Sequence, residues 1–175
     1  MIELSARATL DRSEVTHGDC RLSLMDMGQI TQIMPFKGHA SAVEAQIGMK
    51  LPQPNGTTTQ QTKTVQWFGR GTYLLIGAAP APQMAKHAAI SDQSDGWSIV
   101  SLQGAKCEDV LARLVPVDVR LSKFGIGQTA RTLIQHMNGA LTRTGTDQFE
   151  LMVMRSMTQT LWHDVERAMQ SVAQR

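Results

Sequence analysis

Residues 148–172, with the sequence QFELMVMRSMTQTLWHDVERAMQSV, decide the fold because they join a strand pattern to a helix pattern. The run 148–154 is dominated by apolar side chains and predicts a buried strand. Beyond it, an apolar residue returns every three or four positions, as on the buried face of an amphipathic helix. These positions are Met157, Leu161, Val165, Met169 and Val172. Ser156 and Gln159 have the spacing of a capping box, which predicts the helix start.

The residues before this stretch predict another helix and two more strands. The apolar spacing i, i+3, i+4, i+7 occurs once more and predicts a helix that Pro116 ends. It is formed by Cys107, Val110, Leu111 and Leu114. Strands are predicted over 97–102 and 132–142. The turn before the last strand is assigned to 144–147, with Asn138-Gly139 as an alternative turn that local rules leave open.

The first half of the chain predicts shorter elements. Alternating or strand-forming patterns cover residues 20–27, 30–36, 65–68 and 72–76. The last two are joined by Gly69-Arg70-Gly71, a favourable hairpin connection. A helix opens at Gly38 and is stopped by Pro52. Strand pairs that alternate with helices predict an α+β fold, with a mostly antiparallel sheet and helices packed on one face.

The length of 175 residues favours a single domain. We expect this domain to span residues 19–175. Residues 1–18 are polar and aperiodic, which predicts a flexible N-terminal arm. Residues 52–63 combine Pro, Asn, Gly, Thr and Gln, which predicts a mobile loop within the domain.

Charge and cysteine content exclude several classes of protein. Lys+Arg is 17 and Asp+Glu is 15, a formal net charge of +2, and the basic residues are spread singly. This pattern supports neither a nucleic-acid partner nor a polybasic contact with a membrane. No apolar run approaches the length of a membrane helix, about 20 residues. Cys20 and Cys107 lack a Cys-x-x-Cys spacing, and a reducing, cytoplasmic compartment fits them best.

The residues that carry chemistry do not form a known site pattern. The five histidines include no His-Glu-x-x-His motif, so no metal site is expected. There is no Gly-x-Ser-x-Gly elbow, and capping explains Ser156, so no catalytic residue is assigned. Glycines at 69–71 and 125–127 do not continue into a phosphate-binding fingerprint. The low charged fraction, 18%, and the 11 methionines favour a module that acts through contacts.

Several segments, in order along the chain, resemble one protein family. The run Trp67-Phe68-Gly69-Arg70-Gly71-Thr72-Tyr73-Leu74-Leu75-Ile76-Gly77 resembles the tryptophan-to-leucine hairpin of the sarcosine oxidase gamma subunits. Residues 92–99 resemble the next strand of that family, and residues 104–118 resemble the helical segment that follows it. The final strand and helix of the family resemble Asp147-Gln148-Phe149-Glu150-Leu151, Arg155-Ser156 and Leu161-Trp162.

This resemblance implies a non-catalytic, structural gamma subunit of a heterotetrameric bacterial sarcosine oxidase. Such an enzyme oxidises sarcosine to glycine, reduces oxygen to hydrogen peroxide and transfers the one-carbon unit to tetrahydrofolate. The resemblance implies that FAD, FMN, NAD and tetrahydrofolate belong to partner subunits, named alpha, beta and delta, and that this chain holds no cofactor. The gamma subunit is similar in fold to the folate-binding domain of the glycine-cleavage T-protein, so that fold is expected here.

Two alternative functions stay open. One is a stand-alone folate-binding or aminomethyltransferase-like module, and the other is a gamma-like subunit of a related N-methyl amine oxidase. For a folate site the candidate is Glu150, because a carboxylate can accept hydrogen bonds from the donors of the pterin. For the contact with partner subunits the candidates are Arg70, at the hairpin tip, and Arg155, beside the terminal helix, because arginine is enriched at interfaces.

Overall fold

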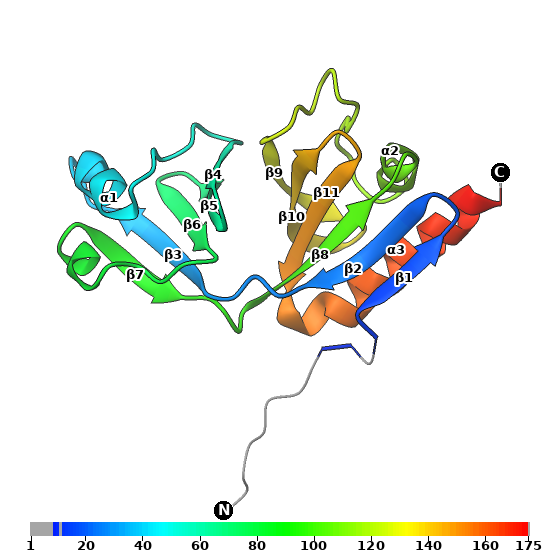
Figure 1. Ribbon diagram of the computed structural model, residues 1–175, viewed down its shortest axis with the longest axis horizontal. Coiled ribbons are helices and arrows are strands. Elements are labelled where there is room, and N and C mark those ends of the chain that lie inside the picture. Colours follow the sequence, from blue (N-terminus) through cyan, green and yellow to red (C-terminus); the bar gives the residue numbers. More distant parts are fainter. Residues whose placement is uncertain (1–8, 11, 175) are drawn as a thin grey trace, which may run out of the picture.

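The computed structural model describes residues 9–10 and 12–174 and shows two antiparallel sheets set side by side (Figure 1). The six-stranded sheet has the order β1 (Glu14–His17), β2 (Cys20–Met25), β8 (Trp97–Gln103), β11 (Gln148–Met154), β10 (Met137–Gly145) and β9 (Thr129–Ile134). The five-stranded sheet has the order β4 (Thr57–Gln60), β5 (Lys63–Gly69), β6 (Thr72–Ile76), β3 (Ile30–Pro35) and β7 (Ala88–Asp92). The helices are α1 (Ala40–Ile47), α2 (Cys107–Leu111) and α3 (Thr158–Ala173), with short 3-10 helices η1 (Pro82–Lys86) and η2 (Arg155–Met157).

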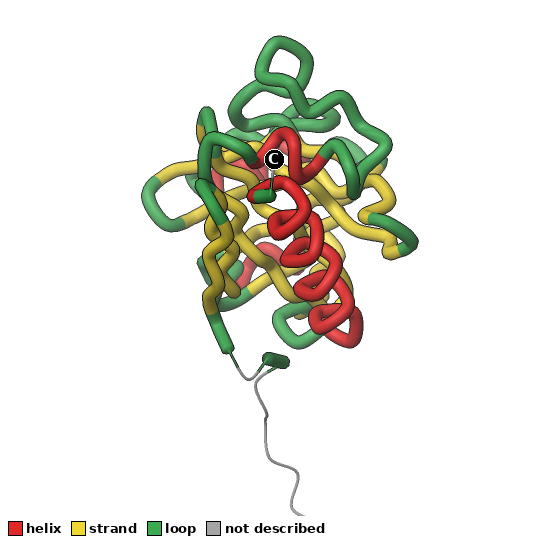
Figure 2. Tube along the Cα trace, turned by 90° about the vertical axis from the view of Figure 1, so that its right-hand side faces the viewer, coloured by secondary structure: helices red, strands yellow, loops and turns green. Residues whose placement is uncertain are grey.

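The six-stranded sheet carries α2 and α3 on its outer face. Alternate residues of β11, Phe149, Leu151 and Val153, are buried in one cluster with Leu161 and Val165 of α3. Most of the apolar stripe predicted for the C-terminal helix is the face that α3 buries, but Met157 lies before α3, in η2, and is 43% exposed. Packing of the buried face stabilises α3, because isolated helices are marginal in water. Figure 2 shows α3 running along the outer side of this half of the molecule.

The five-stranded sheet carries α1 on its own outer face, where Val43 and Ile47 pack with strand residues such as Ile33. The inner faces of the two sheets meet in a third cluster. In it, Phe68 and Ile76 from the five-stranded sheet are buried together with Ile99 and Met152 from the six-stranded sheet. This cluster is why the two sheets pack against each other although no strand is shared between them.

The predicted fold class is confirmed: the chain is α+β, its strands are antiparallel, and each sheet carries helices on one face. The strands divide between two sheets because the chain crosses over after β2. Residues 26–29 lead from β2 into β3, which pairs with β6 and β7 in the other sheet. The chain returns through residues 93–96 into β8.

The prediction of a flexible arm over residues 1–18 is wrong for its last part, because Glu14–His17 form β1 and pair with β2. Long-range contacts hold this polar strand in place. Arg12 forms an ion pair with Glu166 of α3, and His17 Nε2 lies 3.3 Å from Glu166 Oε1. Residues 1–8 and 11 lie outside the described residues.

The loop predicted over residues 52–63 contains a strand. Thr57–Gln60 form β4, which pairs with β5, so this part of the expectation is corrected. Threonine is a strand former, and here a neighbouring strand completes its hydrogen bonds. The start of β4 also reaches the other sheet: Gly56 forms a bridge with Gln128, and the Thr57 N–H donates to Gly127 O at 2.8 Å.

The strand predicted over 132–142 is divided by a turn at Gln135–His136, and Asn138-Gly139 is not a turn but part of β10. Gln135 takes the left-handed conformation that the turn needs, with φ of 53°. Gly139 is needed for a different reason, because a Cβ there would lie 2.5 Å from Met152 O in β11. The capping box is also absent, since the first turn of α3 is held by Thr158 Oγ1 donating to Arg155 O at 2.7 Å.

Arg143 of β10 is the largest fully buried side chain of the described residues. Its guanidinium group lies 4.2 Å from the ring centroid of Phe149 and donates to Glu108 of α2, to Val119 O and to Thr146 O. Because a buried charge must be paired and hydrogen-bonded, these contacts fix α2 and the segment after it against the sheet.

We expect Arg143→Met to lower the free energy of unfolding by about 3 kcal/mol, because it removes the ion pair with Glu108 and leaves the carbonyl of the buried Val119 without its donor. Urea unfolding followed by circular dichroism measures this change. Arg120→Met is the matched control, since the Arg120–Asp118 ion pair lies at the surface and contributes little. A loss for Arg143→Met no larger than that of the control would contradict the assignment.

Candidate functional site

The three residues predicted from the sequence lie on separate elements. Glu150 is on the central strand β11, and Arg70 is exposed at the turn between β5 and β6. Arg155 is half-buried in η2, where its backbone N–H donates to Gly96 O at 2.9 Å. Within the part of the chain that the structure describes, no ion pair involves Glu150, and burial is the cause of its pKa shift. The two arginines and the glutamate therefore do not form one charged cluster.

Glu150 belongs to a row of polar side chains that crosses the inner face of the six-stranded sheet. Phe149 and Leu151 point to the helices, so Glu150 points to the opposite face, where Met152 meets the five-stranded sheet. The strand register places Glu150 directly between Ser101 of β8 and Thr142 of β10.

The buried end of this row is fully hydrogen-bonded. Thr142 Oγ1 donates to Thr129 Oγ1 at 2.9 Å, and Thr129 Oγ1 donates to Leu141 O at 3.2 Å. Gln66 of β5 donates to Thr129 Oγ1 at 2.9 Å, so the row also joins the two sheets. Gln66, Thr129 and Thr142 are almost inaccessible to water, and these bonds offset the cost of burying them.

The carboxyl group of Glu150 has no hydrogen-bond or ion-pair partner among the described residues, and burial raises its pKa. Desolvation disfavours the charged form, so the neutral acid is favoured relative to a carboxyl group in water. A group in this state can donate one hydrogen bond and accept others. Glu150 is thus a polar group on the inner face with no partner among the described residues.

Sequence reasoning missed Arg131, which lies on β9 at the edge of the same inner face. Its guanidinium carbon is 3.9 Å from the ring centroid of Phe68 and 5.7 Å from that of Trp97. The two rings pack edge to face, with centroids 5.1 Å apart. Phe68 and Trp97 both lie in segments that the sequence singled out, but nothing local indicates that an arginine from β9 covers them.

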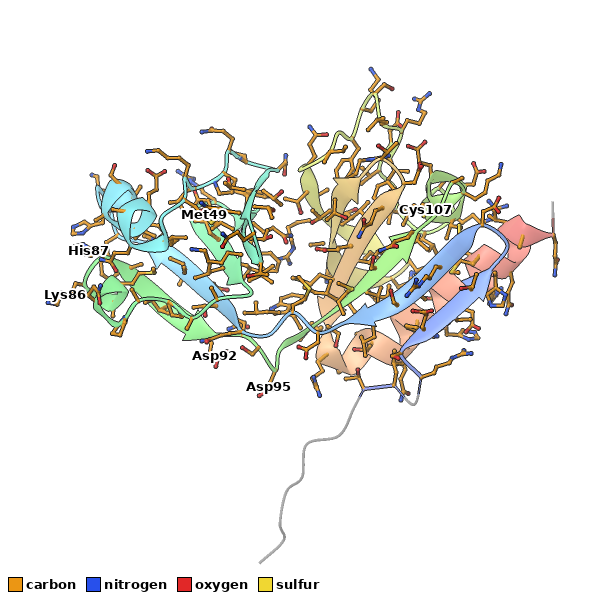
Figure 3. All side chains as sticks on the ribbon, viewed as in Figure 1. Met49, Lys86, His87, Asp92, Asp95 and Cys107 are labelled. Carbon is orange, nitrogen blue, oxygen red and sulfur yellow. The ribbon has the colours of Figure 1, made fainter. Side chains whose placement is uncertain are left out.

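Cys20 and Cys107 contact each other in the core of the six-stranded half of the molecule. Burial raises the pKa of the Cys20 and Cys107 thiols, which suppresses the reactive thiolate. His39 Nδ1 and His87 Nδ1 lie 2.9 Å apart at the far end of the five-stranded sheet, in the half of the molecule opposite to Cys107 (Figure 3). In the part of the chain that the structure describes, no three His, Cys, Asp or Glu side chains gather as metal ligands, and no helix is both long and apolar enough to span a membrane.

Comparison of the sequence with known protein families identifies the class to which this fold belongs. Residues 55–174 match the family described as the GCVT N-terminal domain, and the chain belongs to this family. The match begins just before β4 and runs through α3. It therefore includes the row of polar side chains on the inner face, which contains Glu150 and Thr129 and which we call the Thr129 row, and also the contact of Arg131 with the aromatic rings.

Two curated proteins show which members of the class the chain is similar to. It is 25% identical over 166 residues to the sarcosine oxidase subunit gamma of Corynebacterium sp. strain P-1, covering 87% of this chain and 82% of that protein. It is 24% identical over 170 residues to the corresponding subunit of Corynebacterium sp. strain U-96, covering 89% and 82%. The resemblance to sarcosine oxidase gamma subunits that the motifs predict is confirmed.

Two solved structures share the fold. A chain of the heterotetrameric sarcosine oxidase from Corynebacterium sp. U-96, in complex with pyrrole 2-carboxylate, superposes with a TM-score of 0.80 at 22% identity, covering 92% of this chain and 89% of that one. The glycine cleavage system aminomethyltransferase T from Bartonella henselae superposes with a TM-score of 0.55 at 16% identity, covering 86% of this chain and 46% of that one. The expected T-protein-like fold is confirmed.

The raised pKa of Glu150 predicts a pH-dependent stability. As the pH rises above the ordinary carboxyl pKa of about 4.3, the unfolded chain releases this proton while the folded chain retains it to a higher pH, so folding becomes less favourable until the raised pKa of the folded state is passed. Glu150→Gln cannot titrate and avoids this loss. We expect the Tm of Glu150→Gln minus that of the wild type to increase from about pH 4 to about pH 8.

The control for this experiment is Gln148→Asn, which alters a side chain on the same face of β11 without a titratable group. Its Tm difference from the wild type should be constant across the same pH range. A Glu150→Gln difference that stays constant as well would show that the native carboxyl group is not desolvated.

Proposed function

We propose that this chain is a non-catalytic gamma-type subunit of a heterotetrameric sarcosine oxidase. The observation that carries the proposal is the similarity to curated gamma subunits over 82% of their length, together with the shared fold. The complex would demethylate sarcosine oxidatively to glycine and transfer the one-carbon unit to tetrahydrofolate. This chain would contribute a folded surface to that assembly rather than reacting groups.

The structure supports this proposal because several charged side chains hold elements of the fold together. Arg143 and Glu108 hold α2 to the sheet, and Glu166 holds β1 through Arg12. The two thiols are buried with raised pKa values. These groups have structural partners, and their chemistry is that of a scaffold.

The partners that we propose are the alpha, beta and delta subunits of the oxidase, in the cytoplasm. FAD, FMN, NAD and tetrahydrofolate would be held by those subunits. Arg70 and Arg155 remain the interface residues proposed from the sequence. Arg70 fits this role because it is exposed at a hairpin tip, where a partner can reach it.

Recovery from the cytosol of cells that make the whole complex tests the proposal. A tagged form of this chain should bring larger, flavin-bearing chains with it in a fixed ratio, measured by mass spectrometry and flavin absorbance. The pure chain alone should hold no flavin and should make no hydrogen peroxide from sarcosine. Recovery of the chain alone, or peroxide from the pure chain, would contradict the proposal.

A second function, a stand-alone folate-binding module, is favoured by one observation: Glu150 is an unpartnered carboxyl group on the inner face of a GCVT-family fold. Calorimetric titration of the pure chain with tetrahydrofolate separates the two functions. A scaffold gives a flat titration. A folate-binding module gives saturable heat that Glu150→Gln abolishes and Gln148→Asn preserves.

A further inference from the structure

We propose that the rim of the six-stranded sheet around Arg131 docks an acidic segment of a larger subunit, in which an Asp or Glu side chain pairs with the Arg131 guanidinium. We call this surface the β9 rim and define it as Arg131, Leu133 and Met154, with Phe68 and Trp97 beneath them. The choice of partner rests on the proposed function, whereas the acidic chemistry rests on the residues themselves.

The first step concerns the charge of Arg131. The described carboxylates form ion pairs with other residues or lie elsewhere, and none of them reaches this guanidinium. Arg131 is an exposed residue whose guanidinium lies over the two rings, and the partial burial of this group lowers its pKa. The rings of Phe68 and Trp97 attract the cation, but they accept none of its five N–H donors in a planar fork. A carboxylate is the group that this fork binds best.

The second step concerns the apolar side chains beside it. Leu133 is two residues from Arg131 on β9 and so shares its face, and it is 45% exposed. Met154, 54% exposed, lies on the same face of β11 and pairs with Trp97. The register places Asn138 of β10 opposite Leu133 and beside Met154. The rim therefore combines an arginine that has no described ion-pair partner with exposed Leu and Met, above the buried Phe68 and the half-buried Trp97, a composition typical of interfaces.

The third step concerns the sheet edge. β9 is the last strand of its sheet, and the N–H of Thr129 points away from β10 because it donates to Asn55 O at 2.8 Å. The N–H of Gln135 also points outward, to Leu114 O at 2.7 Å. By alternation, the backbone groups of Arg131 and Leu133 face the same way, and no described residue bonds to them.

Between Thr129 and Gln135, whose outward N–H groups are already bonded, the free edge of β9 has only two outward-facing residues, Arg131 and Leu133. That is too short to add a whole strand but sufficient for a segment that crosses the edge and is held mainly by its side chains. A free small anion would use Arg131 and leave Leu133 and Met154 exposed. A nucleic acid would need a basic surface that a net charge of +2 with dispersed Lys and Arg does not provide. Charge complementarity and the apolar flank therefore favour an acidic polypeptide.

The test uses the whole complex, reconstituted with Arg131 variants of this chain. Arg131→Glu should weaken assembly with the flavin-bearing subunits on the order of 100-fold, and Arg131→Lys should weaken it less, since the charge remains but the planar fork is lost. Arg167→Glu is the matched control, an exposed arginine of α3 on the opposite face, and it should leave the affinity unchanged. Thermal unfolding of each variant alone verifies that it folds.

The Arg131→Lys variant also identifies the partner, because its amine can be joined to a nearby carboxylate by a zero-length carbodiimide. A cross-link to an Asp or Glu of a larger subunit, found by mass spectrometry, is the expected result. A cross-link to a second copy of this chain, or wild-type affinity in Arg131→Glu, would overturn the inference while the proposed function stands. Failure of the wild-type chain to assemble would overturn both.

Discussion

Arg143 places a guanidinium group beyond the reach of water, against the ring of Phe149, and three segments of the six-stranded half supply partners for its terminal nitrogens. Its side chain takes its partners from α2, from Val119 in the segment after that helix, and from the turn at Thr146. Removing a charge from water costs several kcal/mol unless its donors are used, so these segments have little freedom to lie elsewhere.

The backbone of the same residue extends this constraint to the other sheet. Arg143 N donates to Gln128 O at 3.0 Å, and Gly127 N donates to Arg143 O at 2.9 Å. Gln128 forms the bridge with Gly56, at the entry to β4. The backbone of Arg143 therefore positions residues 127 and 128, just before β9 begins. The same residues form the link to the other sheet, next to Thr129.

Local pattern predicted the elements that periodicity, turn residues or composition mark. The apolar stripe of α3 repeats every three or four residues, the hairpin of β5 and β6 has a Gly-Arg-Gly connection, and β8, although buried on both faces, is rich in strand formers. The alternative turn at Asn138-Gly139 is wrong, because the sequence does not distinguish a glycine that a turn needs from a glycine that a close neighbouring strand needs. β1 could not be predicted from its own residues, since Glu166 of α3, about 150 positions away, stabilises it through Arg12 and His17.

Glu150 and Arg131 both lie on the inner face without an ion-pair partner among the described residues, but the energetic cost of lacking a partner differs between a carboxyl and a guanidinium group. Glu150 was reached from the family resemblance, whereas Arg131 depends on a strand register that no local pattern encodes. Burial raises the pKa of Glu150, which lowers the cost of leaving its carboxyl group unpaired as a neutral acid. A guanidinium group cannot give up its proton in a protein, so Arg131 keeps its charge and gains from any carboxylate that approaches. Helices pack on the outer faces, so a partner that pairs with Arg131 would approach from the inner-face rim.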